Sequence, residues 1–157
     1  MLRVSEGEHS SSRFTTYLEH AQDVLGQWID WSQKSKVALV IVTSTVGGAV
    51  RMPGALMAVS ETGESCGYIS GGCIDADVVN HAREALRSGQ AAWLRYGNGS
   101  PFMDLPLPCG GAIEICVLPN AKDDILRACH YRLASRLTVT LNLSETGDLR
   151  LGQSPVA

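Results

Sequence analysis

Two cysteines of this chain stand next to glycine pairs, which mark places where a backbone bends sharply or approaches a ligand closely. Cys73 follows two glycines in YISGGCIDADVV (68–79), and Cys109 precedes two glycines in LPCGG (107–111). The free N–H groups at the start of a predicted helix favour a thiolate at Cys73, whereas Asp75 and Asp77 disfavour a second negative charge there. Cys73 therefore fits a working thiol and a buried structural thiol equally, while Cys109, in a loop, fits a functional thiol better.

A third glycine-rich loop, GGAVRMPG (47–54), contains Arg51, the one cation within the three loops. A guanidinium offers a fork of donors to phosphate, and the exposed N–H groups of glycine-rich loops and helix starts attract anions. The loops would meet on one rim if the strands near residues 37–45, 65–69 and 113–118 were neighbours. The residues thus indicate a site suited to an anionic ligand, without specifying that ligand.

The elements that must position these loops follow from hydrophobic periodicity and from turn residues. Helices are predicted over about 13–33, from after Cys73 to about 87 with Gly89 as its stop signal, and through 125–133. Strands are predicted at 37–45, 55–60, 65–69, 91–96 and 112–118, followed by a hairpin from 137 that turns at Gly147. The predicted fold is α/β, a mixed sheet with flanking helices, in a single domain over 13–157 after a flexible N-terminus at 1–12.

Composition and charge exclude several classes of protein. The chain has 157 residues, 45% hydrophobic and 18% charged, with a net charge of −3 and no basic run, which argues against a disordered tail and a phosphate-binding nucleic-acid protein. The N-terminus lacks the apolar core of a signal peptide, so a cytoplasmic protein with free thiols is expected. Cys66, Cys116 and Cys129 lie within predicted strands or a helix and are expected in the core. The equal spacing of Cys66 to Cys73 and of Cys109 to Cys116 lacks the short knuckles of zinc sites and is a weak signal for a metal site.

The order of the three motifs resembles the XdhC/CoxI family, accessory proteins for molybdenum hydroxylases. The similarity runs from about Trp28 to Pro119 and combines VALVIVTSTVGGAVRMPGALM, GYISGGCIDADVV and CGGAIEI. The resemblance implies a protein that binds molybdenum cofactor (molybdopterin), protects it during sulfuration with a cysteine desulfurase, and passes it to a xanthine dehydrogenase-type enzyme. The cofactor-binding residues it implies are Gly47, Arg51, Gly54, Gly71, Gly72, Cys73, Asp75, Cys109, Gly110 and Gly111. Cys73 and Cys109 match the family's motif cysteines and would contact the molybdenum.

The chain also departs from the family pattern. Its first loop reads GGAVR where the family usually has Gly-Ser-x-Pro-Arg, and Asp75 replaces the usual glutamate. Many relatives continue into a Rossmann-type second domain, which is absent here, as expected of a single-domain member, one half of a split pair or a truncated chain. A homodimer that completes the site is compatible with the sequence.

The leading hypothesis is a cofactor-binding chaperone without turnover of its own. Two alternatives remain open at this point: a thiol-dependent enzyme that uses Cys73 or Cys109, and an interaction subunit whose loops dock a separately encoded Rossmann partner. No partner of another kind, neither nucleic acid nor membrane, is indicated.

Overall fold

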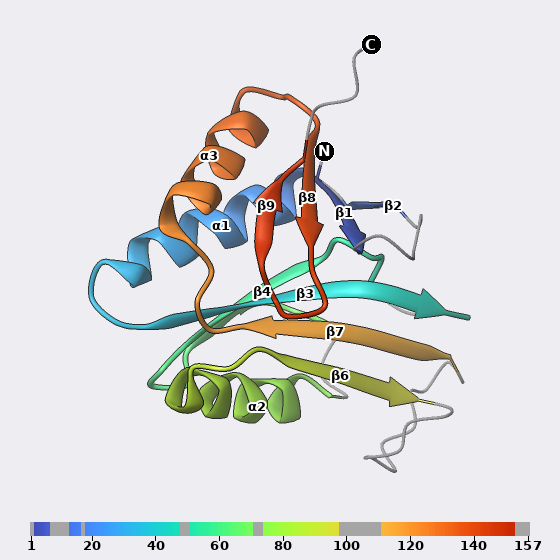
Figure 1. The fold of residues 1–157 in the computed structure, drawn as a ribbon, viewed down its shortest axis with the longest axis vertical. Coiled ribbons are helices and arrows are strands. Elements are labelled where there is room, and N and C mark those ends of the chain that lie inside the picture. Colours follow the sequence, from blue (N-terminus) through green and yellow to red (C-terminus); the bar gives the residue numbers. More distant parts are fainter. Residues whose placement is uncertain are drawn as a thin grey trace.

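The computed structural model describes residues 2–6, 13–16, 18–47, 51–70, 74–97 and 111–152. The helices are α1 (Leu18–Ser32), α2 (Asp75–Ser88) and α3 (Asp123–Ala134). The strands are β1 (Leu2–Glu6), β2 (Arg13–Thr16), β3 (Val37–Val46), β4 (Leu56–Ser60), β5 (Ser65–Gly67), β6 (Ala92–Gly97), β7 (Ala112–Leu118), β8 (Val139–Leu143) and β9 (Leu149–Leu151). The fold is therefore α/β, as predicted, with the helices flanking the strands (Figure 1).

Two sheets divide the strands between them. The larger has the order β5-β4-β3-β7-β6 and is antiparallel throughout, whereas the smaller has the order β2-β1-β8-β9 and contains one parallel pair, β1 with β8. In Figure 1, α2 lies on one side of the larger sheet, and α1, α3 and the smaller sheet lie on the other. Strand β3 is thus covered on both faces, which explains its continuous apolar run.

Alternate residues of β3 enter two hydrophobic clusters. Leu39 and Ile41 pack with residues of α1, α3 and β8, while Val40 and Val42 pack with residues of α2. All four side chains are fully buried, and burial of an aliphatic side chain of this size stabilises a fold by about 1.5–3 kcal/mol. Strand β3 therefore anchors both layers and holds the loops that leave its end.

Helix α2 follows its predicted pattern. It buries Val78, Ala82 and Leu86 against the sheet, and it ends at Gly89, whose φ of 72° is left-handed and whose N–H bonds to the Ala85 carbonyl. This conformation suits glycine because it has no Cβ. The stop signal expected from the sequence is confirmed.

The N-terminal expectations differ from the structure. The helix predicted over 13–33 begins only at Leu18, because Arg13–Thr16 form β2, which pairs with β1 in the segment expected to be flexible. Strand β1 also pairs with β8, far away in the sequence. Pairing with a distant strand outweighs the helical spacing of the apolar residues here, since strand formation depends on tertiary neighbours more than on local preference.

Among the described residues, no helix combines the length and the apolar character that crossing a bilayer requires.

Candidate functional site

Two of the glycine-rich loops leave the larger sheet at the same end. Strand β3 ends at Val46, which pairs with Ala112 at the start of β7, and Ala112 pairs in turn with Gly97 at the end of β6. We call this end, defined by Val46, Gly97 and Ala112, the motif edge (Figure 1). The segments that contain Arg51 and Cys109 therefore both begin or end at the motif edge.

Glycine is required where these loops approach each other. A Cβ at Gly47 would lie 3.2 Å from the Gly111 Cα, and a Cβ at Gly97 would lie 2.1 Å from the Gly111 carbonyl oxygen. Gly47 and Gly97 also have positive φ angles, 76° and 97°. The predicted site residues Gly47 and Gly111 are thus brought together, and Gly97, which motif reasoning missed, completes the contact. Its signal was the GNG triplet at 97–99.

The segment before α2 is held at both ends by side chains. Asp75 Oδ1 accepts hydrogen bonds from the Ser70 N–H (3.0 Å) and Ser70 Oγ (2.6 Å), and its Oδ2 accepts one from the Ile69 N–H (3.2 Å). The buried Ser70 Oγ also accepts a bond from the Ile74 N–H at 3.1 Å. These bonds fix the two residues between which Gly71, Gly72 and Cys73 are inserted. Asp75, expected to contact a ligand, has both carboxylate oxygens engaged with the preceding turn.

A second bond joins α2 to the motif edge. Tyr96, one residue before Gly97, donates its hydroxyl hydrogen to Asp77 Oδ2 at 2.6 Å. Burial raises the pKa of Tyr96, and the nearby Asp77 carboxylate raises it further. His81 Nε2 lies 3.4 Å from the same carboxylate oxygen. Asp77 therefore ties the first turn of α2 to the end of β6, whereas the sequence indicated only compensation of the helix dipole. The 19-residue separation of Asp77 and Tyr96 leaves no local signal.

Arg51 is the one strongly buried cation of the described residues, with 6% of its surface exposed. Its guanidinium carbon lies 4.3 Å from the centroid of the Tyr68 ring, within the range of a cation–π contact. No ion pair joins Arg51 to any described carboxylate. The fork of donors of a guanidinium in this position could hold a phosphate or another anion.

The turn behind Arg51 positions it. Gly54, with a φ of 91°, donates its N–H to the Val42 carbonyl at 2.8 Å, and the Ala55 N–H bonds to the Met52 carbonyl at 3.1 Å. These bonds return the chain from the motif edge to β4. Gly54, a predicted site residue, therefore shapes the turn that carries Arg51.

The described cysteines are structural. Cys116 and Cys129 are fully buried in the core, as expected, and burial raises the pKa of Cys129 to about 12. Cys66 is partly buried against the same core, and burial raises its pKa as well. No group of three or more His, Cys, Asp or Glu side chains within the described ranges is placed to hold a metal ion. The predicted site residues Gly71, Gly72, Cys73, Cys109 and Gly110 lie outside the described residues.

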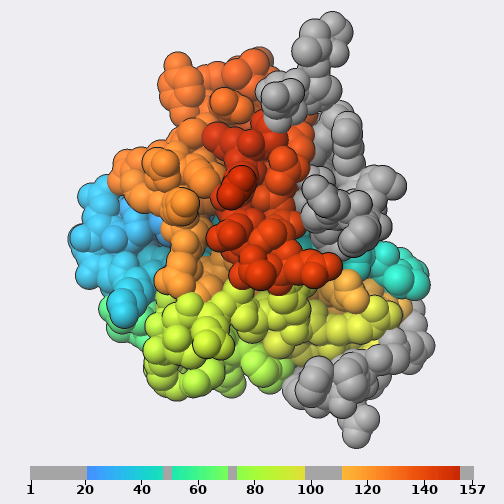
Figure 2. Space-filling model, viewed as in Figure 1, coloured from blue at the N-terminus to red at the C-terminus, as the bar shows by residue number. Residues whose placement is uncertain are grey.

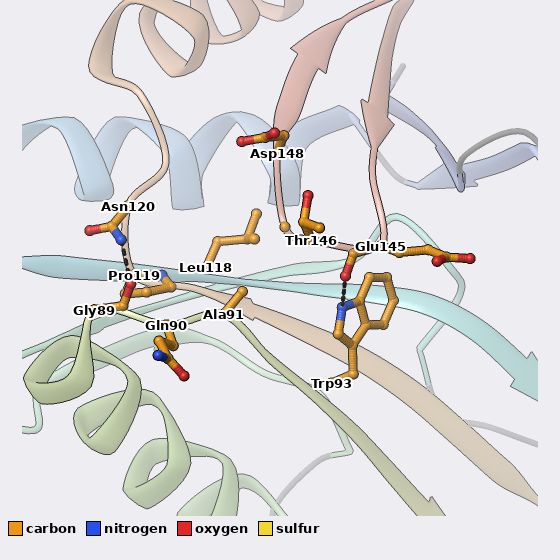
Figure 3. Close-up of a pocket in the computed structure, with 11 residues that line it drawn as sticks. Gly89, Gln90, Ala91, Trp93, Leu118, Pro119, Asn120, Glu145, Thr146 and Asp148 are labelled. Atoms are coloured by element: carbon orange, nitrogen blue, oxygen red, sulfur yellow. Dashed lines mark hydrogen bonds between the residues drawn. The ribbon is translucent and has the colours of Figure 1, made fainter.

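Two cavities lie at the other end of β7 from the motif edge. One, of about 450 Å³, opens where the β8–β9 turn meets the α2–β6 connection (Figure 3), and Trp93 Nε1 donates to the Glu145 carbonyl there at 3.0 Å. The second, of about 480 Å³, shares Gly89 and Asn120 with it. Figure 2 shows the β8–β9 hairpin lying against β6 at this place. Neither cavity is lined by a predicted site residue, so the cavities and the motifs are separate features.

Comparison with known proteins identifies the motif region. The model of the XdhC and CoxI family matches residues 30–97, the range that holds Arg51 and the turn before α2. Residues 30–97 belong to the XdhC and CoxI family. The chain is 42% identical over 103 residues to the molybdenum cofactor insertion chaperone PaoD of Escherichia coli (strain K12), a match that covers 66% of this chain and 32% of PaoD. The chain thus spans about a third of the length of this relative.

The chain also resembles a solved structure. A chain described as a xanthine dehydrogenase from Bacillus halodurans superposes with a TM-score of 0.63 at 20% identity, over 82% of this chain and 40% of that one. At this identity the likeness concerns the fold alone.

Proposed function

We propose that this XdhC/CoxI chain binds molybdenum cofactor and assists its insertion into a molybdoenzyme of the xanthine dehydrogenase type. The observation that carries the proposal is Arg51, buried on the Tyr68 ring without an ion-pair partner among the described residues. The 42% identity to an insertion chaperone supports the same function.

The chemistry of the cofactor suits this site. The cofactor is a pterin with a phosphate and a dithiolene-bound metal, so it carries negative charge and soft sulfur ligands. The Arg51 guanidinium holds one of its anionic groups, and the contact with Tyr68 keeps that guanidinium in place. A charge-assisted hydrogen bond is about twice as strong as a neutral one, and more so in a partly dry site.

The remaining motif residues extend this site. The backbone N–H groups of the glycines at 71–72 and 110–111 would hold the cofactor, and Cys73 and Cys109 would contact its molybdenum. The cofactor is sulfurated on the protein with a cysteine desulfurase and then delivered in the cytoplasm. The chain carries the cofactor and catalyses no reaction of its own. It acts as a single chain or as one half of a homodimer.

The test is metal and pterin analysis of the whole chain after incubation with molybdenum cofactor and gel filtration. Near-stoichiometric molybdenum and pterin are expected on the wild type. Arg51→Met keeps a long apolar stem against Tyr68 but removes the charge, and we expect cofactor affinity to fall at least about tenfold, since a charged hydrogen bond contributes about 1.5–3 kcal/mol. Cys73→Ala and Cys109→Ala should also lose cofactor.

The matched control is Arg87→Met, because Arg87 is exposed at the C-terminal end of α2, away from the motif edge. Its cofactor content should equal that of the wild type, and thermal unfolding should show that all variants are folded. A wild type that retains no cofactor, or an Arg51→Met variant that retains as much as the wild type, would refute the proposal.

A further inference from the structure

The end of β3 at the motif edge departs from regular pairing with β7. As far as Val42 the two strands pair residue for residue, and Val42 stands opposite Ile115. The next pair is Ser44 with Glu114, so Thr43 is one extra residue on β3, which is a β-bulge. Because side chains alternate between the two faces of a strand, an extra residue turns those beyond it to the opposite face. The core residues before Thr43 therefore do not fix the register of the last part of β3.

Glu114 joins the strands at this place. Its carboxylate accepts a hydrogen bond from Ser44 Oγ at 3.0 Å and another from Arg95 Nη1 at 2.7 Å. Its carbonyl oxygen accepts a third from Thr43 Oγ1, the side chain of the extra residue, at 3.2 Å. Arg95 pairs with Glu114 in the register of β6 with β7. Glu114 thus connects β3, β7 and β6, the three strands whose ends define the motif edge.

A charged residue is unexpected on this face of β7. Cys116 and Leu118, the next residues on the same face, are buried in the apolar core. The side chains of Glu114 and Arg95 are 35% and 39% exposed, where an ion pair adds little to stability. A slip of β3 by one residue would break its bonds to Glu114, so the carboxylate favours one register over the others.

We infer that Glu114 is a positioning residue of the cofactor site, because it holds β3 in register beyond the bulge and so sets the spacing of the loops that leave the motif edge. The inference rests on the proposed function and adds a residue that acts through others. A Cβ at Gly47 would lie 3.2 Å from the Gly111 Cα. A slip by one residue would move Gly47 about 3.4 Å along β7 and end this close approach. The segments that contain Arg51 and Cys109 continue from the two strands concerned, so their spacing depends on the same register.

The experiment measures the affinity of the whole chain for molybdenum cofactor by anaerobic ultrafiltration and molybdenum analysis. Glu114→Leu removes the carboxylate and keeps a side chain of similar size, and we expect the affinity to fall at least about tenfold. Because Arg95 is partly exposed, water solvates its guanidinium in this variant, and the variant should fold. Glu114→Gln keeps both side-chain bonds, since a serine hydroxyl accepts as well as donates, and its affinity should lie within about threefold of the wild type.

The matched control is Glu84→Leu. Glu84 also pairs with an arginine, Arg87, but on the exposed surface of α2, so its replacement should change the cofactor affinity by less than about twofold. Ser44→Ala removes one of the two bonds to the Glu114 carboxylate with a smaller change of side chain, and it should also weaken cofactor binding.

Amide hydrogen exchange of the cofactor-free chains, followed by NMR, separates this inference from the proposed function. In Glu114→Leu the amides of residues 44–47, 95–97 and 112–114 should exchange at least about tenfold faster than in the wild type, and those of residues 39–41 at an unchanged rate. A general loss of stability would accelerate both groups. Equal exchange at the motif edge, or equal cofactor affinity of Glu114→Leu and the wild type, would overturn the inference. A wild type that retains no cofactor would refute the proposed function, and the exchange rates would still decide whether Glu114 positions the loops.

Discussion

Replacement of Tyr96 by phenylalanine tests how the site is held together. The substitution keeps the ring in its buried place, where only 1% of the residue is exposed, and removes the hydroxyl that bonds to Asp77 at 2.6 Å. We expect Tyr96→Phe to fold and to be less stable than the wild type.

The size of the effect follows from the surroundings of the bond. A hydrogen bond to a charged group contributes about 1.5–3 kcal/mol. The Asp77 side chain is 26% exposed, so water replaces part of the lost contact and the loss of unfolding free energy should be about 1.5 kcal/mol. For a chain of this length such a loss lowers the melting temperature by about 3–6 °C.

The pH dependence gives a second measure. The pKa of Tyr96 is raised in the folded protein, so the folded state keeps a proton that the unfolded state releases above about pH 10. The stabilisation by Tyr96 is therefore complete below about pH 10 and is lost as the pH rises further. Phenylalanine has no such proton, so the difference between the two proteins should shrink above that pH.

The assay is urea unfolding followed by circular dichroism, at neutral pH and above pH 10. Tyr131→Phe is the control, because Tyr131 is 72% exposed and its substitution should change the free energy of unfolding by less than about 0.5 kcal/mol. A double-mutant cycle with Asp77→Ala should give a coupling energy of about 1 kcal/mol or more. Equal stability of Tyr96→Phe and Tyr131→Phe, or no coupling to Asp77, would show that this bond does not join α2 to β6.

Two further predictions concern the core and the loop contact. Burial raises the pKa of Cys129 to about 12 and also raises that of Cys66. At pH 8, iodoacetamide should therefore leave Cys129 unlabelled in folded protein, which mass spectrometry would show. Rapid labelling of Cys129 without unfolding would contradict its buried position. Gly97→Ala should lower the free energy of unfolding by about 3 kcal/mol or more, because its Cβ would lie 2.1 Å from the Gly111 carbonyl oxygen. Gly63 has a φ of 92° but only side-chain atoms of Arg83 nearby, so Gly63→Ala should lower it by about 1–2 kcal/mol. Equal losses in urea unfolding would mean that the loops do not touch at Gly97.

The sequence by itself determined the features that depend on short windows. The apolar run of β3, the stop of α2 at Gly89 and the hairpin turn at Gly147 all follow from local periodicity and from glycine's freedom at positive φ. The order of the three motifs also indicated the XdhC/CoxI family, whose model matches residues 30–97. These features are local because a turn or a helix end is decided by a few neighbouring residues.

Only the tertiary structure decided which distant residues meet. The bond of Tyr96 to Asp77, the close approach of Gly97 to Gly111 and the conversion of Arg13–Thr16 into β2 join segments that no single window contains. The burial of Arg51 on Tyr68 belongs to the same class, since the motif shows a cation and the fold alone shows that it is covered and without an ion pair to the described carboxylates. Such contacts form only when the whole chain packs, because their free energy depends on desolvation by residues far apart in the sequence.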